Sequence, residues 1–142
     1  MKTVLFVCTG NTCRSPMAMA LFNQMARLRG RDWRALSAGR AAMAGQGASA
    51  GARAAMADWG LDLSAHRAAP LSVELLAQAD LVVGMSPAHV AGVPGGVSLG
   101  ELAGTGEAVA DPFGGDVDVY RLCADQIARL LKAADERGAF GP

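Results

Sequence analysis

The sequence has no excess of charge of either sign and no long hydrophobic run. Its 142 residues hold 13 basic and 13 acidic side chains, which gives a formal net charge of zero. Balanced charge argues against a protein held to nucleic acid by a basic surface and against a polybasic membrane anchor. No apolar stretch approaches the roughly 18 residues of a transmembrane helix. We therefore expect neither nucleic acid nor a membrane as a partner.

Cysteine and histidine are also scarce, with three and two residues in the chain. An odd and small number of cysteines excludes a disulfide scaffold. The apolar run near the start is only about five residues long, too short for the core of a signal peptide. These features predict a cytoplasmic protein with reduced thiols. Cys8, Cys13, His66 and His89 have poor spacing for zinc, and Arg14 would crowd a cation, so we expect no metal site.

The order of apolar segments predicts an α/β fold. Strands are expected at residues 3–7, 33–38, 80–85 and 95–99, helices at 16–29, 48–59, after Ser72, after 86 and over 120–137, and loops at 41–47 and 100–116. Strands that alternate with helices favour a parallel sheet, and a chain of this length fits one domain. We expect a single domain over residues 1–142, a three-layer sandwich with a four-stranded parallel sheet and helices on both faces.

The segment between the first strand and the first helix is the strongest functional feature. It reads Cys8-Thr9-Gly10-Asn11-Thr12-Cys13-Arg14-Ser15. A short loop at the carboxyl end of a parallel strand turns its N–H groups inward, beside the positive end of the next helix, and so binds an anion such as phosphate. Gly10 and Asn11 tolerate the left-handed backbone that a tight loop needs. The planar guanidinium of Arg14 can clamp two phosphate oxygens.

Cys8 lies at the base of this predicted anion site. Helix N-termini and nearby cations favour the thiolate, which is the nucleophilic form of cysteine. A thiolate at this place can attack phosphorus in line, and Ser15 can hydrogen-bond the sulfur and ease its departure. The alternative is a small buried cysteine beside a structural turn. The coincidence of a strand, a glycine turn, Arg14 and a helix favours the catalytic interpretation.

On these residues the sequence resembles the low-molecular-weight protein tyrosine phosphatases, whose loop reads Cys, five residues, Arg, then Ser or Thr. The match is VCTGNTCRSPMA, and it extends to Ser37-Ala38-Gly39 and to Asp111-Pro112-Phe113. The order of the expected elements agrees over nearly the whole chain. The resemblance implies phosphorylated protein substrates, inorganic phosphate as product and a monomer. It implies no cofactor, because an arginine and the loop amides supply the positive charge.

The resemblance also implies roles for individual residues. Cys8 would form a cysteinyl-phosphate, and Arg14 would bind the phosphoryl oxygens together with the loop amides of Thr9, Gly10, Asn11, Thr12 and Cys13. Asn11 would hold the loop in shape with Ser37 as its partner. Asp111 would be the general acid for the leaving group and then the base that activates water. The residues around Asp111 support this role only in part. A Gly-rich loop that can move and a proline that fixes the local backbone fit a general acid, but they also fit an ordinary exposed aspartate in a loop.

Two other residues keep two interpretations each, and a third has one. The resemblance suggests a reversible Cys8–Cys13 disulfide that protects the nucleophile from over-oxidation, but Cys13 also fits a small residue that packs the loop. His66 either supports the active site or, as the residues alone favour, is a surface or packing histidine. Cys123 falls on the apolar stripe of the last helix and is expected in the core.

The phosphorylated residue is indicated by two departures from the commonest tyrosine phosphatase pattern. Thr12 stands where Ile is usual, and Phe113 is followed by two glycines where many members carry a second aromatic residue. The stretches CTGNTCRSPM and DPFGGDVDVY resemble the bacterial protein-arginine phosphatase branch. Thr12 would narrow the pocket for a planar guanidinium, and Phe113 would form one apolar wall. We therefore expect phosphoarginine as the substrate, with phosphotyrosine as the alternative.

Two rival functions were weighed. Thiol-dependent arsenate reductases share this fold, but they relay electrons through extra cysteines near the third strand, and residues 80–100 contain none. A non-catalytic phosphoprotein-binding module is disfavoured because Cys8, Arg14 and Asp111 are present together. The chain also lacks a Gly-x-x-x-x-Gly-Lys nucleotide loop, and its glycines at 45, 47 and 51 do not fit a dinucleotide fingerprint.

Overall fold

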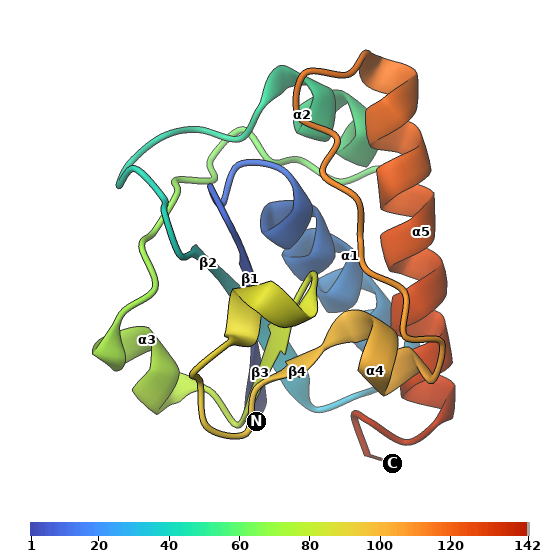
Figure 1. The fold of residues 1–142 in the computed structure, drawn as a ribbon. Helices are drawn as coiled ribbons and strands as arrows, with labels where there is room; N and C mark the ends of the chain where they lie inside the picture. The colour runs from blue at the N-terminus through green and yellow to red at the C-terminus, as the bar shows by residue number, and fades with distance from the viewer. Residues whose placement is uncertain (142) are drawn as a thin grey trace.

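A four-stranded parallel sheet forms the centre of the computed structural model, which describes residues 1–141 (Figure 1). The strands are β1 (Lys2–Cys8), β2 (Trp33–Gly39), β3 (Leu81–Gly84) and β4 (Val97–Ser98), in the order β2-β1-β3-β4. Cys8 pairs with Gly39, and Val7 pairs with Gly84. The carboxyl ends of the three longer strands therefore meet at one edge of the sheet, directly before the predicted anion loop.

Five α-helices and one 3₁₀ helix join these strands within the described residues. They are α1 (Arg14–Arg29), α2 (Ala50–Ala57), α3 (Val73–Gln78), η1 (Pro87–Val90), α4 (Leu99–Ala103) and α5 (Val117–Glu136). The expected α/β fold with a four-stranded parallel sheet is confirmed. Over residues 1–141, no helix is both long and apolar enough to cross a membrane.

The prediction of a continuous loop over 100–116 is wrong at its start, where α4 lies. The Ser98 side chain accepts the Glu101 N–H at 3.1 Å and so caps this helix, and Gly104 ends it with a left-handed backbone. Gly100 inside the helix is required because a Cβ there would collide with the Glu107 backbone. The segment was predicted as a loop because it is rich in glycine, but Gly100 serves the packing of this helix and Gly104 its C-terminal cap.

Side chains of β1 alternate between two cores, one on each face of the sheet. Phe6 points to the larger core, where its ring packs edge-on against Phe22 of α1 with centroids 5.8 Å apart. Leu5 and Val7 point to the smaller core, with Val90 of η1. Helices α1, α2 and α5 pack together over the first face, and α3 and η1 cover the second. This arrangement is the expected three-layer sandwich.

The segment between α4 and α5 returns along α5, as Figure 1 shows. The Gln126 side chain donates to the Ala108 carbonyl at 3.2 Å, and Arg129 binds the Glu107 carboxylate at 2.6 and 2.9 Å. The Val109 N–H donates to the Met85 carbonyl just beyond β3, at 2.9 Å. These contacts carry the next residues of the segment, from 110 to 113, to the sheet edge where β1 ends.

Candidate active site

The loop from Cys8 to Cys13 has its carbonyl groups occupied and its N–H groups available. The carbonyl oxygens of Cys8, Thr9, Thr12 and Cys13 accept backbone N–H groups at 2.9 to 3.1 Å. Among the backbone hydrogen bonds of residues 1–141, none is donated by the N–H groups of residues 9–13. Backbone N–H groups that lack a protein acceptor are free to donate to a ligand or to water. Next to the N-terminus of α1, these N–H groups are placed where they can donate to an anion.

Asn11 fixes the shape of this loop from inside. It is fully buried, and its φ of 56° places it in the left-handed region that asparagine tolerates. Its side-chain amide donates to Ser15 Oγ at 2.8 Å and to Ser37 Oγ at 3.0 Å, and Oδ1 accepts the Ala69 N–H at 2.9 Å. The Asn11 carbonyl also accepts from His66 Nε2 at 2.8 Å. The residue thus ties the loop to α1, to β2 and to the segment after α2.

Cys8 is the last residue of β1, and its side chain is buried below the loop. Its sulfur lies 2.8 Å from Ser15 Oγ in the first turn of α1. The Ser15 oxygen already accepts a hydrogen from Asn11, so its own hydroxyl hydrogen is left for Cys8 or for the Ala38 carbonyl, 3.4 Å away. Serine at this place can therefore donate to a thiolate on Cys8.

Arg14 and Asp111 face each other although 97 positions separate them in the chain. Arg14 is buried, its Nη1 donates to the Val109 carbonyl at 3.1 Å, and its Nη2 lies 3.7 Å from Asp111 Oδ2. The Asp111 side chain is 54% exposed, and Oδ1 accepts the Phe113 N–H at 3.1 Å. The carboxylate is thus held at the mouth of the loop by a turn of its own segment, and it remains open to solvent.

A hollow of about 240 Å³ lies over the loop and gathers most of the predicted site. It is lined by Cys8, Thr9, Gly10, Thr12, Cys13, Arg14, Gln46, Asp111 and Phe113. Phe113 is 79% exposed and stands at the rim. The other predicted residues, Asn11, Ser15 and Ser37, lie below the hollow as supports. Gln46 was not predicted, because nothing in its Gly-rich segment marks it.

His89 of η1 forms a hydrogen bond with the hydroxyl of Thr9 in the loop. Its Nδ1 accepts the Ser86 N–H at 3.1 Å, so in the neutral ring the hydrogen is on Nε2, which lies 3.0 Å from Thr9 Oγ1 and donates to it. Burial lowers the pKa of His89, the positive charge of Arg14 lowers it further, and Asp111 opposes them. The neutral form is therefore favoured in the folded protein.

The two remaining cysteines lie near the hollow in different surroundings. The Cys13 sulfur lies 3.4 Å from Ser49 Oγ and 3.7 Å from the Tyr120 hydroxyl, and burial raises the pKa of that tyrosine. Cys123 lies in the core, as expected, with its sulfur 3.7 Å from the Ala110 carbonyl. Burial raises its pKa to about 12, so this thiol is not a nucleophile at neutral pH.

Sequence reasoning missed His89 as a member of the site and gave His66 a supporting role only as the less favoured of two interpretations. The preferred interpretation of His66 as a surface or packing residue is wrong, since its ring nitrogen donates to the Asn11 carbonyl. His89 was weighed only as a zinc ligand. Within residues 1–141, no group of three or more His, Cys, Asp or Glu side chains is arranged to hold a metal ion. A serine three residues before His89 was the available signal, because that spacing fits a helix cap.

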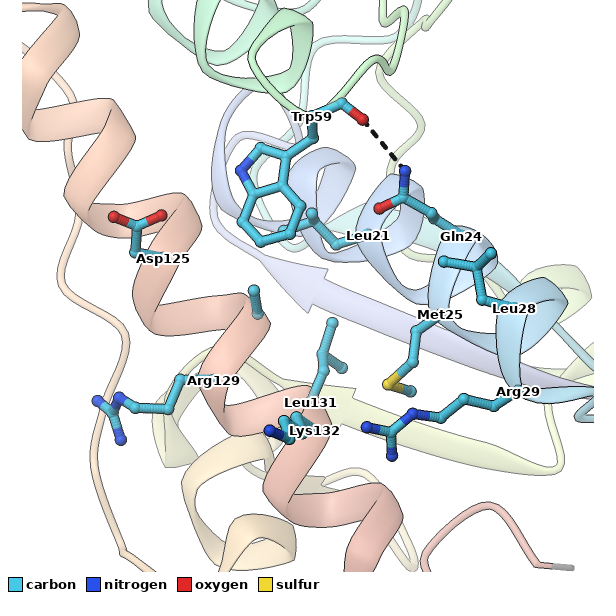
Figure 2. A pocket seen from close by; sticks show the side chains of 11 residues that line it. Leu21, Gln24, Met25, Leu28, Arg29, Trp59, Asp125, Arg129, Leu131 and Lys132 are labelled. Carbon is cyan, nitrogen blue, oxygen red and sulfur yellow. Dashed lines mark hydrogen bonds between the residues drawn. The ribbon is translucent and has the colours of Figure 1, made fainter.

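A second hollow, of about 490 Å³, lies between α1 and α5 (Figure 2). Its walls include Leu21, Met25 and Leu28 of α1, and Trp59 lies at one end, where its carbonyl accepts from Gln24 at 3.1 Å. It contains none of the predicted site residues, and Leu28 is about 20 Å along α1 from Arg14. The smaller hollow, which contains the predicted nucleophile and the free loop N–H groups, is therefore the better candidate for the active site.

Comparison with known proteins agrees with this geometry. The sequence pattern of the family described as "Low molecular weight phosphotyrosine protein phosphatase" matches residues 3–136. A protein-arginine-phosphatase of Bacillus subtilis is 38% identical, with 91% of both chains covered. The crystal structure of a low molecular weight protein tyrosine phosphatase from T. tengcongensis has a TM-score of 0.90 and 39% identity, covering 96% of this chain and 99% of that one. A YwlE arginine phosphatase mutant with a phosphorylated active site serine has a TM-score of 0.88 and 36% identity, covering 94% of each chain.

Proposed function

This chain belongs to the low molecular weight phosphotyrosine protein phosphatase family, and we propose that it hydrolyses phosphoarginine in proteins through a cysteinyl-phosphate on Cys8. The observation that carries the proposal is the hollow in which the Cys8 thiol, the free N–H groups of the loop, Arg14 and Asp111 come together. Nucleophile, oxyanion site and general acid are the three groups that phosphoryl transfer through a covalent intermediate needs.

In the first step, the Cys8 thiolate attacks phosphorus as the phosphoryl group enters the loop. An S–P bond forms while the P–N bond to the substrate arginine breaks, and the departing nitrogen takes a proton from the Asp111 carboxyl. Arg14 and the loop N–H groups bind the equatorial oxygens, where negative charge gathers in the transition state. The relative with a phosphorylated active site serine supports a covalent intermediate at this place in the fold.

In the second step, water attacks the phosphorus of the cysteinyl-phosphate. The Asp111 carboxylate takes a proton from the water, the S–P bond breaks, and inorganic phosphate leaves. Ser15, 2.8 Å from the sulfur, stabilises the departing thiolate by donating its hydroxyl hydrogen. Asp111 ends the cycle protonated, and is therefore ready to act as the acid in the next one.

Hydrolysis of a chromogenic aryl phosphate tests the catalytic proposal. We expect Cys8→Ser to abolish turnover and Asp111→Asn to lower kcat by about 100- to 10,000-fold, the usual contribution of general acid–base catalysis. Ser64→Ala, an exposed substitution in the segment after α2, is the control and leaves turnover unchanged. Equal and negligible activity in wild type and both active-site variants would sink the enzyme assignment.

Phosphoarginine is favoured over phosphotyrosine by Thr12 in the hollow and by relatives named protein-arginine-phosphatase at 38% and 37% identity. Thr12 brings a hydroxyl into the hollow where Ile would bring none, and a guanidinium can hydrogen-bond with it whereas a phenyl ring cannot. Phe113 offers one apolar wall at the rim, and the two glycines after it offer none. Phosphotyrosine stays the second candidate, because the relative from T. tengcongensis is named a tyrosine phosphatase.

Peptides that carry either phosphorylated residue test this preference. We expect wild type to have the higher kcat/KM for phosphoarginine peptides, and Thr12→Ile to shift the ratio toward phosphotyrosine by about 10-fold or more, the effect of small steric changes in a binding pocket. Thr12→Val, which keeps the volume near that of threonine, separates shape from polarity. A wild type that prefers phosphotyrosine, with a ratio that Thr12→Ile leaves unchanged, contradicts the phosphoarginine proposal.

We further propose that residues 1–142 act as one phosphatase domain, as a monomer in the cytoplasm. The sheet and both cores draw on segments from the start of the chain to Phe140, which favours a single folding unit. A catalytic thiol must stay reduced to react, and the cytosol keeps thiols reduced.

A further inference from the structure

Exposed apolar side chains gather beside Asp111, at the rim of the catalytic hollow and next to it. Phe113, Leu122 and Val119 are 79%, 69% and 42% exposed, and all three belong to the segment of Asp111 or to the first turns of α5. Single exposed apolar residues are ordinary on protein surfaces, whereas a cluster of them marks a contact site. The catalytic steps proposed above do not use Val119 or Leu122.

Val119 and Leu122 line a third, smaller hollow of about 160 Å³ next to the catalytic one, whereas Phe113 stands at the rim of the catalytic hollow itself. It is lined by Ala110, Asp111, Pro112, Val119, Leu122, Cys123 and Gln126. Asp111 lines both hollows, so they adjoin at the general acid. Only Asp111 and Gln126 contribute polar groups, and the amide of Gln126 is engaged with the Ala108 carbonyl. The remaining surface suits an apolar side chain.

The walls of this hollow are fixed by contacts of the segment with α5. The Cys123 sulfur lies 3.7 Å from the Ala110 carbonyl, and the Gly115 N–H donates to the Pro112 carbonyl at 2.9 Å. A Cβ placed on Gly115 would lie only 2.8 Å from the Val119 Cβ, so this turn packs directly on α5. A hollow that exists before binding costs little ordering when a side chain enters it.

We propose that this hollow is a subsite for one apolar side chain next to the phosphorylated residue of a protein substrate. The inference rests on the proposed function, since Asp111 must reach the leaving atom of that residue. The two hollows share Asp111, and the neighbouring residue of the peptide has its Cα only about 3.8 Å from that of the phosphorylated residue, so its side chain is in reach of the adjoining hollow. Pockets for whole small ligands have about 300–1,000 Å³, so 160 Å³ fits a single side chain.

Charge near the hollow disfavours an acidic neighbour. Asp111 lines the hollow, Asp116 caps α5, and Asp118 lies in the first turn of α5 beside Val119, so this part of the chain is acidic. Arg121, the nearby cation on α5, is engaged with Asp58 at 2.7 Å and with Asp118 at 3.1 Å. A peptide with an aspartate beside its phosphorylated residue would meet like charges, whereas a leucine would bury apolar surface.

Matched phosphopeptides test the subsite. Two series carry Leu, Ser or Asp directly before or directly after the phosphorylated residue, in the phosphopeptide class that wild type hydrolyses faster. In at least one series we expect kcat/KM for Leu to exceed that for Asp by about 10-fold, the lower range for apolar contacts in binding pockets. Leu122→Ser lowers this Leu-to-Asp ratio to about 2-fold, because it removes the largest apolar wall. The ratio is taken within each enzyme, so it is independent of overall activity.

Leu28→Ser is the matched control, since Leu28 is 79% exposed and lines the distant hollow between α1 and α5. It keeps both the wild-type ratio and the turnover of an aryl phosphate. Equal ratios for wild type and Leu122→Ser, or no preference for Leu in either series, overturn the subsite. A wild type that hydrolyses the aryl phosphate but no phosphopeptide overturns the protein-phosphatase proposal itself, and the subsite with it.

Discussion

At the scale of single residues, the site depends on polar groups whose hydrogen-bond roles are fixed by their partners. His66 can only donate to the Asn11 carbonyl, and the Ser86 N–H makes Nδ1 of His89 an acceptor. A neutral His89 therefore donates to Thr9, whose own hydroxyl hydrogen is free for another acceptor. Protonation of His89 would require the Ser86 contact to break and would add a positive charge near Arg14.

The lowered pKa of His89 predicts a pH dependence of stability. In the unfolded chain this histidine titrates near its ordinary value of 6.5, while burial, Arg14 and Arg40 hold the folded pKa lower. Below about pH 6.5 the unfolded state therefore binds more protons than the folded state. The contribution of His89 to stability is fully present above pH 6.5 and is lost as the pH falls through the folded pKa. We expect the stability difference between wild type and His89→Gln to shrink from pH 7.5 to pH 5.5 in urea titrations.

Glutamine can accept from Ser86 and donate to Thr9, so this variant keeps the contacts and removes the titration. His66→Gln is the control, since it leaves His89 and its titration in place, and its difference from wild type does not follow the same curve. A His89→Gln variant whose free energy of unfolding runs parallel to that of wild type between these pH values contradicts the assignment.

Cys8 and Cys13 line the same hollow, and both are free thiols. We expect mild peroxide to take two electrons from this pair and form a Cys8–Cys13 disulfide, with a mass loss of two hydrogens and recovery by a reducing agent. In Cys13→Ser the same treatment should carry Cys8 on to the irreversible sulfinic acid. Mass spectrometry of peptides reads both outcomes. Wild type that shows only over-oxidised Cys8 would refute the redox role.

At the scale of elements, a glycine in α2 allows this helix to pack closely against α5. Gly51 lies against the ring of Tyr120, and a Cβ there would collide with it. Tyr120 in turn directs its hydroxyl to the Cys13 sulfur at 3.7 Å. The close approach of α2 to α5 therefore bears on the loop, although α2 itself contributes no group to the catalytic hollow.

Replacing Gly51 tests this packing. We expect Gly51→Ala to lower the free energy of unfolding by up to about 2 kcal/mol, because overpacking costs about 1–3 kcal/mol and the better helix propensity of alanine returns about 1 kcal/mol. Gly47→Ala, where a Cβ would meet only the end of Arg67 at 3.9 Å, is the control. That change should stabilise slightly, by about 0.4–1 kcal/mol. Chemical denaturation measures both, and equal effects would contradict the role of Gly51.

At the scale of the whole molecule, the net charge is zero, but some of the charged side chains form ion pairs between segments that are distant in the sequence. The Asp135 side chain on α5 has no exposed surface and binds Arg29 at 2.8 Å and Arg31 at 3.0 and 3.2 Å. These two arginines lie at and just beyond the end of α1. The pair thus fixes α1 to α5 at the end opposite the catalytic loop.

Removing the Asp135 charge should destabilise the protein. We expect Asp135→Asn to cost about 2–3 kcal/mol, because hydrogen bonds to charged groups contribute about 1.5–3 kcal/mol. Burial opposes ionisation of Asp135, but the bonds from Arg31 and Arg29 outweigh it and lower its pKa. This contribution is therefore complete above the ordinary pKa of about 4 and is lost as the pH falls through the lower folded value.

Thermal unfolding at pH 7 and pH 3 measures this effect, with Asp58→Asn as the control. Asp58 pairs with Arg121 on the surface, with both side chains nearly half exposed, so its loss costs at most about 1 kcal/mol. Should Asp135→Asn be no worse than Asp58→Asn at pH 7, the buried pair does not fasten α1 to α5.

The sequence by itself determined the chemistry-bearing loop and the class of fold. Residues 8–15 carry the proposed nucleophile, the glycine, the asparagine and the arginine in one continuous stretch, and the apolar run before them marks a buried strand. A site of this kind can be predicted from the sequence because the groups that act together are neighbours in the chain. Helix α4 was missed because the glycines at 100 and 104 serve its packing and its end.

Only the tertiary structure decided what surrounds that loop. His66, His89 and Gln46 come from segments 35 to 81 positions after Asn11 or Cys8, and no local pattern links them to it. The hollow beside Asp111 exists because hydrogen bonds and a glycine hold the segment before α5 against that helix. Side chains from separate segments meet only when the sheet forms and brings the ends of its strands to one edge, and that is a property of the fold.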